Sequence, residues 1–141
     1  MGVAFVACTS KKDIETTTTA TIVPGSAEDF AQNVSNTVYF GFDRYNLTPE
    51  AEDVLKAVAA WFQTYPNKQF VIEGHTDKRG TQDYNLGLGS RRAESVKTFL
   101  TKSGLDKSRM STISYGKECL VSQGDEERDH AENRRAHIVV Q

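Results

Sequence analysis

The triplet His75-Thr76-Asp77 directly follows an apolar run at 70–73, and Gly80 comes three residues after it. Such a run predicts a β-strand, so the triplet is expected where that strand ends. His75 and Asp77 are two residues apart, which puts their side chains on one face of an extended chain. The stretch could contribute two metal ligands, half of a catalytic pair, or a loop that holds a charged ligand.

Arg92, fifteen residues after Asp77, offers the opposite charge. It shares a helix face with Leu88, four residues earlier, whereas Arg91 is rotated by about 100°. If the chain folds back from strand to helix, Asp77 and this helix face meet at the edge of the sheet, where α/β proteins often bind ligands. A carboxylate binds an ammonium and a guanidinium forks a carboxylate, so the two residues predict a site for a zwitterion. The alternative is that Asp77 and Arg92 pair with each other and only hold the loop.

Gly87 and Gly89 interrupt this helix at a cost of roughly 1 kcal/mol each relative to alanine. Either the helix starts late and the glycines relieve crowding against the sheet, or they let a ligand or a strand approach the backbone. The sequence leaves both interpretations open.

The surrounding elements alternate between strand and helix from residue 37 onward. Residues 37–43 alternate in hydrophobicity as a strand does, and Thr48 followed by Pro49 is typical of a helix start. The remaining segments are a strand at 70–75, a helix at 84–104, a strand at 110–116, a polar connection at 119–135 and a last strand at 136–141. The order βαβαββ predicts an α/β fold, a two-layer sandwich with a mixed four-stranded sheet and helices on one face.

The N-terminal part, residues 1–36, is expected to lie outside this domain, which spans 37–141. Its first residues, MGVAFVAC, resemble the end of a lipoprotein signal peptide whose Cys8 becomes lipidated, although only seven residues precede Cys8 and none is basic. An ordinary disordered terminus is the alternative. Residues 9–36 are rich in threonine and charge without a sustained period, so they are expected to form a flexible tether.

Composition excludes several classes of function. The 17 basic and 19 acidic residues give a net charge of −2, which offers no electrostatic basis for binding nucleic acid. No run approaches the ~18 apolar residues of a membrane span. Cys8 and Cys119 lie too far apart in sequence to indicate a disulfide framework, and Cys119 is expected to be a partly buried thiol.

Enzymatic chemistry finds little support in the sequence. His130 and His137 lack the spacing of metal ligands, and Thr76 has no evident base. Neither cysteine lies in a catalytic motif. We therefore expect no catalytic residues, no metal and no cofactor.

Residues 76–96, TDKRGTQDYNLGLGSRRAESV, resemble the signature of OmpA-like peptidoglycan-binding domains. FDRYNLTPEA near the start of the domain, and SYGKE and NRRA near its end, are similar to the lipoprotein members of that family. The resemblance covers 37–141. A flagellar stator protein, which also carries such a domain, would need a membrane-spanning helix ahead of it.

The resemblance implies a non-enzymatic protein that binds diaminopimelate, the amino acid with a free zwitterionic end in peptidoglycan stem peptides. It implies that Asp77 binds the ammonium and Arg92 the carboxylate. The remaining site residues that it implies are Phe42, Asp43 and Leu88, which line the pocket, and Thr76, Gly80 and Asn85, which shape the loop. It also implies a lipid on Cys8 in the periplasmic face of the outer membrane, and partners in the Tol system, especially TolB.

Overall fold

The structure, a computed structural model, describes Cys8 and residues 21–141. The predicted signal-peptide end at 1–7 and most of the predicted tether, at 9–20, lie outside the described residues. Within the described part, no helix is long and apolar enough to cross a membrane.

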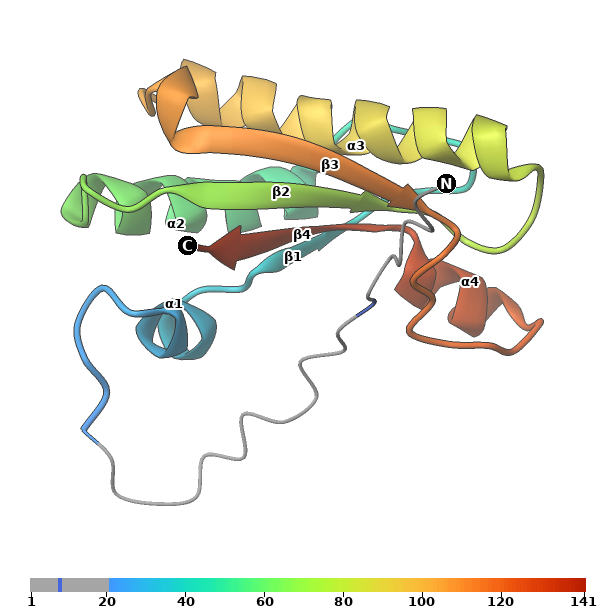
Figure 1. The fold of residues 1–141 in the computed structure, drawn as a ribbon, viewed down its shortest axis with the longest axis horizontal. Coiled ribbons are helices and arrows are strands. Elements are labelled where there is room, and N and C mark those ends of the chain that lie inside the picture. The colour runs from blue at the N-terminus through green and yellow to red at the C-terminus, as the bar shows by residue number, and fades with distance from the viewer. Residues whose placement is uncertain (1–7, 9–20) are drawn as a thin grey trace, which may run out of the picture.

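Four strands form one mixed sheet, as the sequence predicts (Figure 1). In the spatial order β1-β4-β2-β3, β4 is antiparallel to both of its neighbours, and β2 is parallel to β3. The strands are β1 (Thr37–Tyr39), β2 (Phe70–His75), β3 (Met110–Gly116) and β4 (Arg135–Val140). The parallel pair requires a crossover, which α3 (Gln82–Lys102) supplies.

Two helices, α2 (Pro49–Thr64) and α3, cover one face of the sheet (Figure 1). The α2 helix begins where the sequence predicts, because the Thr48 hydroxyl accepts a hydrogen bond from Ala51 N–H and Pro49 needs no donor there. The core lies between these helices and the sheet. Its fully buried side chains include Leu55, Val58, Phe62, Ile72, Val96 and Leu100.

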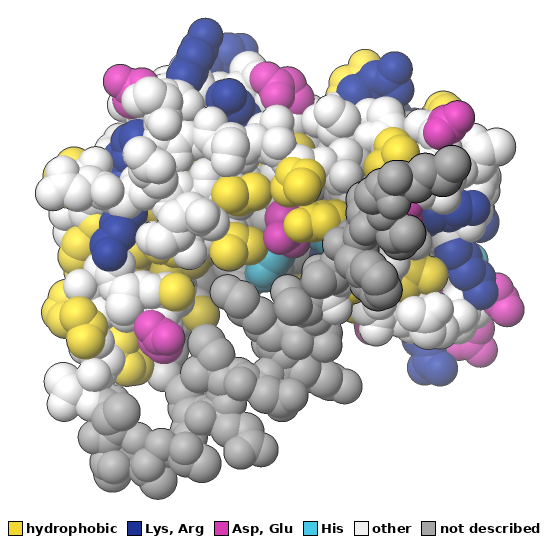
Figure 2. Space-filling model, viewed as in Figure 1, with side chains coloured by type: hydrophobic (Ala, Val, Ile, Leu, Met, Phe, Trp, Pro, Cys, Tyr) yellow, Lys and Arg dark blue, Asp and Glu magenta, His cyan; other side chains and the backbone are white. Residues whose placement is uncertain are grey.

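In the described part of the chain, no helix covers the opposite face of the sheet. Tyr39 and Ile113 are exposed there, and Figure 2 shows apolar side chains gathered on this face with acidic and histidine side chains among them. Two short helices lie in the second half of the chain: the 3₁₀ turn η1 (Lys107–Arg109) before β3, and α4 (Glu127–Asn133) in the predicted polar connection.

The expectation that residues 9–36 carry no structure is wrong for its last part. Helix α1 (Ala27–Asn33) begins at Ser26, whose hydroxyl accepts a hydrogen bond from Asp29 N–H. Phe30 is buried, and its ring lies 4.9 Å from that of Trp61 and 5.3 Å from that of Phe62.

One further bond ties α1 to the domain, since Trp61 Nε1 donates to Asp29 Oδ2 at 3.0 Å. The folded part therefore begins before residue 37. A seven-residue helix with one buried apolar side chain has no sustained period, which is why the sequence pattern missed it.

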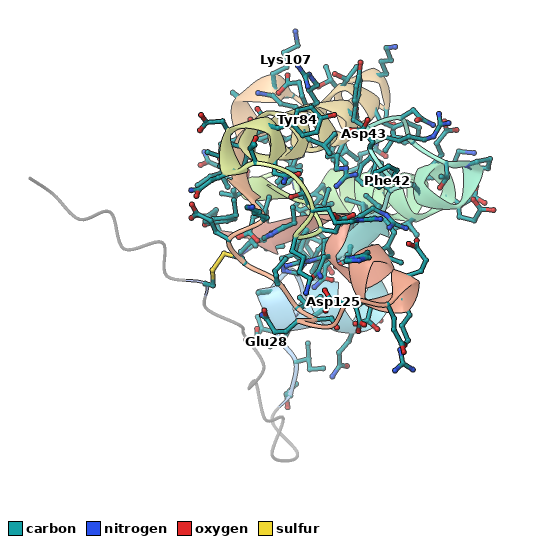
Figure 3. The ribbon with its side chains drawn as sticks, turned by 90° about the vertical axis from the view of Figure 1, so that its right-hand side faces the viewer. Glu28, Phe42, Asp43, Tyr84, Lys107 and Asp125 are labelled. Carbon is teal, nitrogen blue, oxygen red and sulfur yellow. A yellow bond between two sulfur atoms is a disulfide. The ribbon has the colours of Figure 1, made fainter. Side chains whose placement is uncertain are left out.

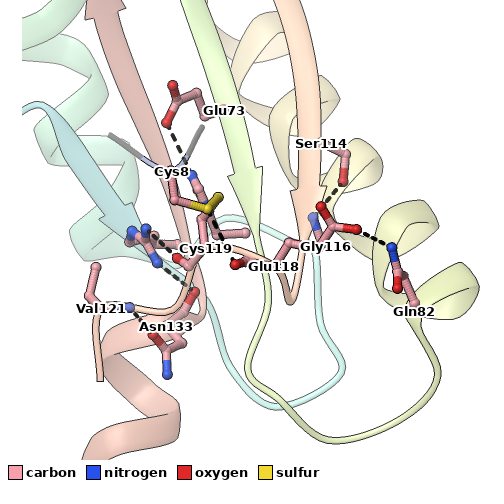
Figure 4. The surroundings of a disulfide bond; sticks show 11 residues. Cys8, Glu73, Gln82, Ser114, Gly116, Glu118, Cys119, Val121 and Asn133 are labelled. Carbon is pink, nitrogen blue, oxygen red and sulfur yellow. Dashed lines mark hydrogen bonds and ion pairs between the residues drawn. A yellow bond between two sulfur atoms is a disulfide. The ribbon is translucent and has the colours of Figure 1, made fainter. Parts of the chain in front are cut away.

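A disulfide joins Cys8 to Cys119 across 111 residues (Figure 4). Cys119 is partly buried as expected, but the expectation that it is a thiol is wrong. Sequence separation could not reveal the pair, because a disulfide depends on Cα–Cα distance, here 5.4 Å, and not on spacing in the chain. In this state the Cys8 sulfur is not free to carry a lipid.

Candidate functional site

A pocket with a volume of about 210 Å³ opens where β2 ends and α3 begins. The loop that follows β1 closes its other side. All eight residues that the sequence predicts for the site line this pocket, together with two that it did not predict: Phe42, Asp43, Thr76, Asp77, Arg79, Gly80, Tyr84, Asn85, Leu88 and Arg92. Figure 3 looks onto this end of the molecule and shows Phe42, Asp43 and Tyr84 side by side.

The loop from β1 brings Phe42 and Asp43 to the pocket. The predicted strand at 37–43 is shorter than expected because the chain turns after Tyr39, where Arg44 N–H donates to Gly41 C=O at 3.2 Å. Asp43 has φ of 54°, a conformation that is uncommon outside glycine and is favoured at functional sites. The turn leaves Phe42 59% exposed on the pocket rim.

Helix α3 lies unusually close to the sheet at Gly89. A Cβ on Gly89 would lie 2.3 Å from Ser114 Oγ, and a Cβ on Gly74 would lie 1.7 Å from the Gly89 carbonyl oxygen. The late helix start is wrong, since α3 begins at Gln82. Relief of crowding against the sheet, and with it the close approach of a strand, is correct for Gly89. Gly87 has no such neighbour.

Asn85 holds the loop between β2 and α3 in place. Its Nδ2 donates to the carbonyl oxygens of Arg79, at 2.8 Å, and Thr81, at 3.0 Å. Gly80, between them, has φ of 93°, which favours glycine. On the strand side, Thr76 N–H donates to Gly116 C=O at 2.9 Å. These bonds fix the backbone on both sides of Asp77.

Arg92 is completely buried and carries its charge into the pocket. Its guanidinium donates to three backbone carbonyl oxygens, those of Arg44 (2.8 Å), His75 (2.8 Å) and Gly41 (3.1 Å). Among the described residues, no carboxylate lies within 4.0 Å of it. Burial lowers the pKa of Arg92 to about 10, so the group remains a cation at neutral pH. These three hydrogen bonds use three of the five N–H groups of the Arg92 guanidinium, so one N–H on Nη1 and one on Nη2 remain available.

Asp77, whose side chain is 7% exposed, already has a cationic partner, Arg79. Its Oδ1 accepts from the Arg79 backbone N–H at 3.0 Å and from Nε at 3.2 Å, and its Oδ2 accepts from Nη2 at 2.8 Å. Burial raises the pKa of Asp77, but the hydrogen bonds from Arg79 outweigh burial and hold the pKa below its usual value. The alternative that Asp77 and Arg92 pair directly is therefore not what the structure has.

A second arginine lies beneath the Asp77 carboxylate. Arg134 Nη1 is 3.9 Å from Asp77 Oδ2, is buried and makes no hydrogen bond to any residue that the structure describes. The rest of this guanidinium is held by Phe40 C=O and by the Glu127 carboxylate.

The rim of the pocket is aromatic and polar. Arg79 lies over the Phe42 ring, with Cζ 4.3 Å from the ring centroid. The Tyr84 hydroxyl donates to Asp43 Oδ1, and this hydrogen bond raises the pKa of Tyr84. Arg79 and Tyr84 are not among the site residues that the sequence predicts. The available signal was their position, since Arg79 is two residues from Asp77 and Tyr84 is in the first turn of α3.

His75 does not share a partner with Asp77. Its Nε2 lies 3.1 Å from Glu73 Oε1, and its ring stacks on Tyr115 with centroids 5.4 Å apart. Burial lowers the pKa of His75, so the ring is neutral at neutral pH. In Cys8 and residues 21–141, no group of three or more His, Cys, Asp or Glu side chains could hold a metal ion.

Comparison with known proteins identifies relatives over most of the chain. The OmpA family profile matches residues 39–134. The peptidoglycan-associated lipoprotein of Agrobacterium fabrum is 37% identical over 99% of this chain and 83% of its own length. The protein of that name from Pasteurella multocida is 44% identical over 81% of this chain and 75% of its own length.

Solved structures share the fold. The crystal structure of the peptidoglycan-associated lipoprotein from Burkholderia pseudomallei is 39% identical, with a TM-score of 0.74 over 76% of this chain and 91% of that chain. The periplasmic domain of MotB from Helicobacter pylori is 19% identical, with a TM-score of 0.64 over 73% of this chain and 69% of that chain. At that identity, the likeness to MotB concerns the fold alone.

Proposed function

This chain belongs to the OmpA family, and we propose that its folded part binds peptidoglycan non-covalently and thereby anchors the protein to the cell wall. The names of its relatives support this function, since the two curated relatives named above and the solved structure, at 37–44% identity, are peptidoglycan-associated lipoproteins. In this proposal the wall is bound and not cut.

The ligand within peptidoglycan is the zwitterionic end of diaminopimelate. The observation that carries this proposal is the unpaired charge of Arg92, a buried cation in an open pocket with no carboxylate within 4.0 Å among the described residues. A ligand carboxylate supplies the missing anion and accepts from the two N–H groups that the backbone carbonyls leave. The Asp77 carboxylate, in the same pocket, takes the ammonium.

The other pocket residues define the shape of the site. Leu88 lies one helical turn before Arg92 on the same face of α3 and offers an apolar wall. Phe42 and Asp43 close the rim, while Thr76, Gly80 and Asn85 keep the loop in its conformation. These residues select a small ligand that carries both charges on one carbon.

Attachment to the outer membrane involves Cys8 in the same proposal. A lipid bound through a thioether would need the sulfur that the Cys119 disulfide occupies, so the lipidated protein and the disulfide-bonded protein are distinct forms. Tol-system proteins, TolB among them, are the proposed protein partners. The intact mass of protein extracted from envelopes tests the lipid: a mass equal to that of the unmodified chain contradicts it.

The experiment that tests the pocket compares two charge changes in sedimentation assays with purified sacculi. Asp77→Asn keeps an oxygen for the Arg79 backbone N–H but loses the charge, and should weaken binding by about thirtyfold to several-thousandfold. Arg91→Ala, on the exposed side of α3, should bind within a few-fold of wild type. Equal losses in the two variants would contradict the pocket.

A second arm changes the wall instead of the protein. Sacculi with lysine in place of diaminopimelate present an amine without the adjacent carboxylate, so they should bind poorly to the wild type. Equal binding of both wall types would contradict recognition of a zwitterion.

A further inference from the structure

Arg79 occupies the position that a ligand ammonium needs. Its guanidinium reaches both oxygens of Asp77, through Nε at 3.2 Å and Nη2 at 2.8 Å, while Cζ lies over the Phe42 ring. The Asp77 side chain is only 7% exposed, so an ammonium cannot reach this carboxylate while the fork of Arg79 covers it.

The other two arginines near Asp77, Arg92 and Arg134, are held in place by several hydrogen bonds. Arg92 donates to three backbone carbonyl oxygens, and Arg134 is held by a carbonyl oxygen and a carboxylate. The Arg79 side chain, by contrast, is 40% exposed, and all of its side-chain hydrogen bonds go to Asp77. Arg79 is therefore the cation near Asp77 that a ligand ammonium can replace.

The Arg79 side chain, already 40% exposed, moves into solvent when it is displaced. The nearby Glu127 carboxylate, which accepts from Arg134 Nη2 at 2.8 Å and is 69% exposed, also favours the charged form of Arg79: it raises the pKa of Arg79 after the larger effect of Asp77. Arg134 Nη1 is buried, makes no hydrogen bond among the described residues and lies 3.9 Å from Asp77 Oδ2. Its charge keeps the Asp77 carboxylate ionised when Arg79 departs.

We propose that Arg79 is a specificity-determining residue that acts as an internal competitor for the ammonium of the ligand. This inference rests on the proposed function. A ligand with both charges displaces Arg79 and pairs with Asp77. A ligand with only a carboxylate reaches Arg92 but leaves Arg79 in place. Arg79 thus lowers the affinity for a ligand that must displace it, and only a ligand that carries a cation of its own can pair with Asp77.

The test is calorimetric titration of the full chain with a stem tripeptide that ends in diaminopimelate. The comparison ligand is the same peptide with the free amine of diaminopimelate acetylated. Arg79→Gln removes the cationic fork, and Arg91→Gln is the control on the exposed face of the neighbouring helix. Arg79→Gln should bind the free-amine peptide about three- to tenfold more tightly than wild type and the acetylated peptide equally well. Unchanged or weaker binding of the free-amine peptide overturns the inference.

A second measurement needs no variant. The NMR resonance of the Arg79 Nε–H in wild-type protein should shift on titration with the free-amine peptide and stay in place with the acetylated one. If both peptides bind but the Arg79 Nε–H resonance shifts with neither, the competitor role is overturned. Failure of the proposed function looks different: in that case Asp77→Asn binds the free-amine peptide as well as wild type does.

Discussion

Strand β2 begins in one kind of environment and ends in another. At its start, Phe70 stacks on Phe62 with ring centroids 3.8 Å apart, and Phe30 and Trp61 complete an aromatic cluster. At its end, the buried groups are charged or polar, and they are held by directed hydrogen bonds. The aromatic end is stabilised by burial of apolar surface, which any well-packed side chains can supply.

The pocket end is organised in the opposite way. Arg92 satisfies three carbonyl oxygens but has no carboxylate within 4.0 Å among the described residues, and Asp77 is paired with a side chain that solvent reaches. Burying the Arg92 charge is costly, and the hydrogen bonds to the three carbonyl oxygens offset that cost. We therefore expect substitutions at the aromatic end to affect the fold alone, and substitutions at the pocket end to affect both the fold and the binding of a ligand.

Arg92→Met tests the comparison with the largest expected effect. The substitution removes three charge-assisted hydrogen bonds to carbonyl oxygens, one of them buried and two part-buried, and such bonds contribute ~1.5–3 kcal/mol each, so unfolding free energy should fall by on the order of 5 kcal/mol. Binding to sacculi should be lost as well. Urea unfolding checks the stability, with Arg91→Met as the exposed control, expected to lie within about 0.5 kcal/mol of wild type. Equal stability of the two variants would show that these bonds do not hold the pocket.

Phe30→Ala should give an intermediate effect of a different kind. It opens a cavity beside Trp61 and Phe62, which should cost about 3 kcal/mol of unfolding free energy, while sacculus binding of the folded protein stays unchanged. Val23→Ala, at a position that is 65% exposed, is the control and should change stability by less than about 0.5 kcal/mol. Loss of binding in Phe30→Ala at a temperature where it is folded would mean that the two ends are coupled.

The effect of acidification on the Asp77–Arg79 pair should be the smallest of the three. The pKa of Asp77 in the folded state lies below its usual value of 3.8, so its contribution to stability is present above that value and is lost as the pH falls through the lower, folded pKa. Thermal unfolding of wild type and Asp77→Asn between about pH 7 and pH 2 measures this contribution as a difference, because the other carboxylates cancel. The difference should shrink on acidification, and a difference that is constant with pH contradicts the Asp77–Arg79 pair.

Features that depend on neighbouring residues could be predicted from the sequence, whereas features that depend on contacts between distant segments could not. The sequence pattern predicted α2 because Thr48, Pro49 and an apolar stripe agree, and it separated Arg92 from Arg91 by helical geometry alone. It missed α1, whose stability depends on a contact between Phe30 and rings thirty residues away. It also missed the disulfide, which depends on where two distant segments meet.

Sequence by itself determined the fold class, the helix face that carries Leu88 and Arg92, and eight of the ten residues that line the pocket. These follow from local periodicity, capping and a recognisable motif, all of which are properties of neighbouring residues. Only the tertiary structure decided which charges pair. Asp77 pairs with Arg79 and not with Arg92, because Arg92 is drawn to carbonyl oxygens of the loop after β1 and the end of β2. Such choices depend on distances of a few ångströms between segments that lie far apart in the chain, and no sequence spacing encodes them.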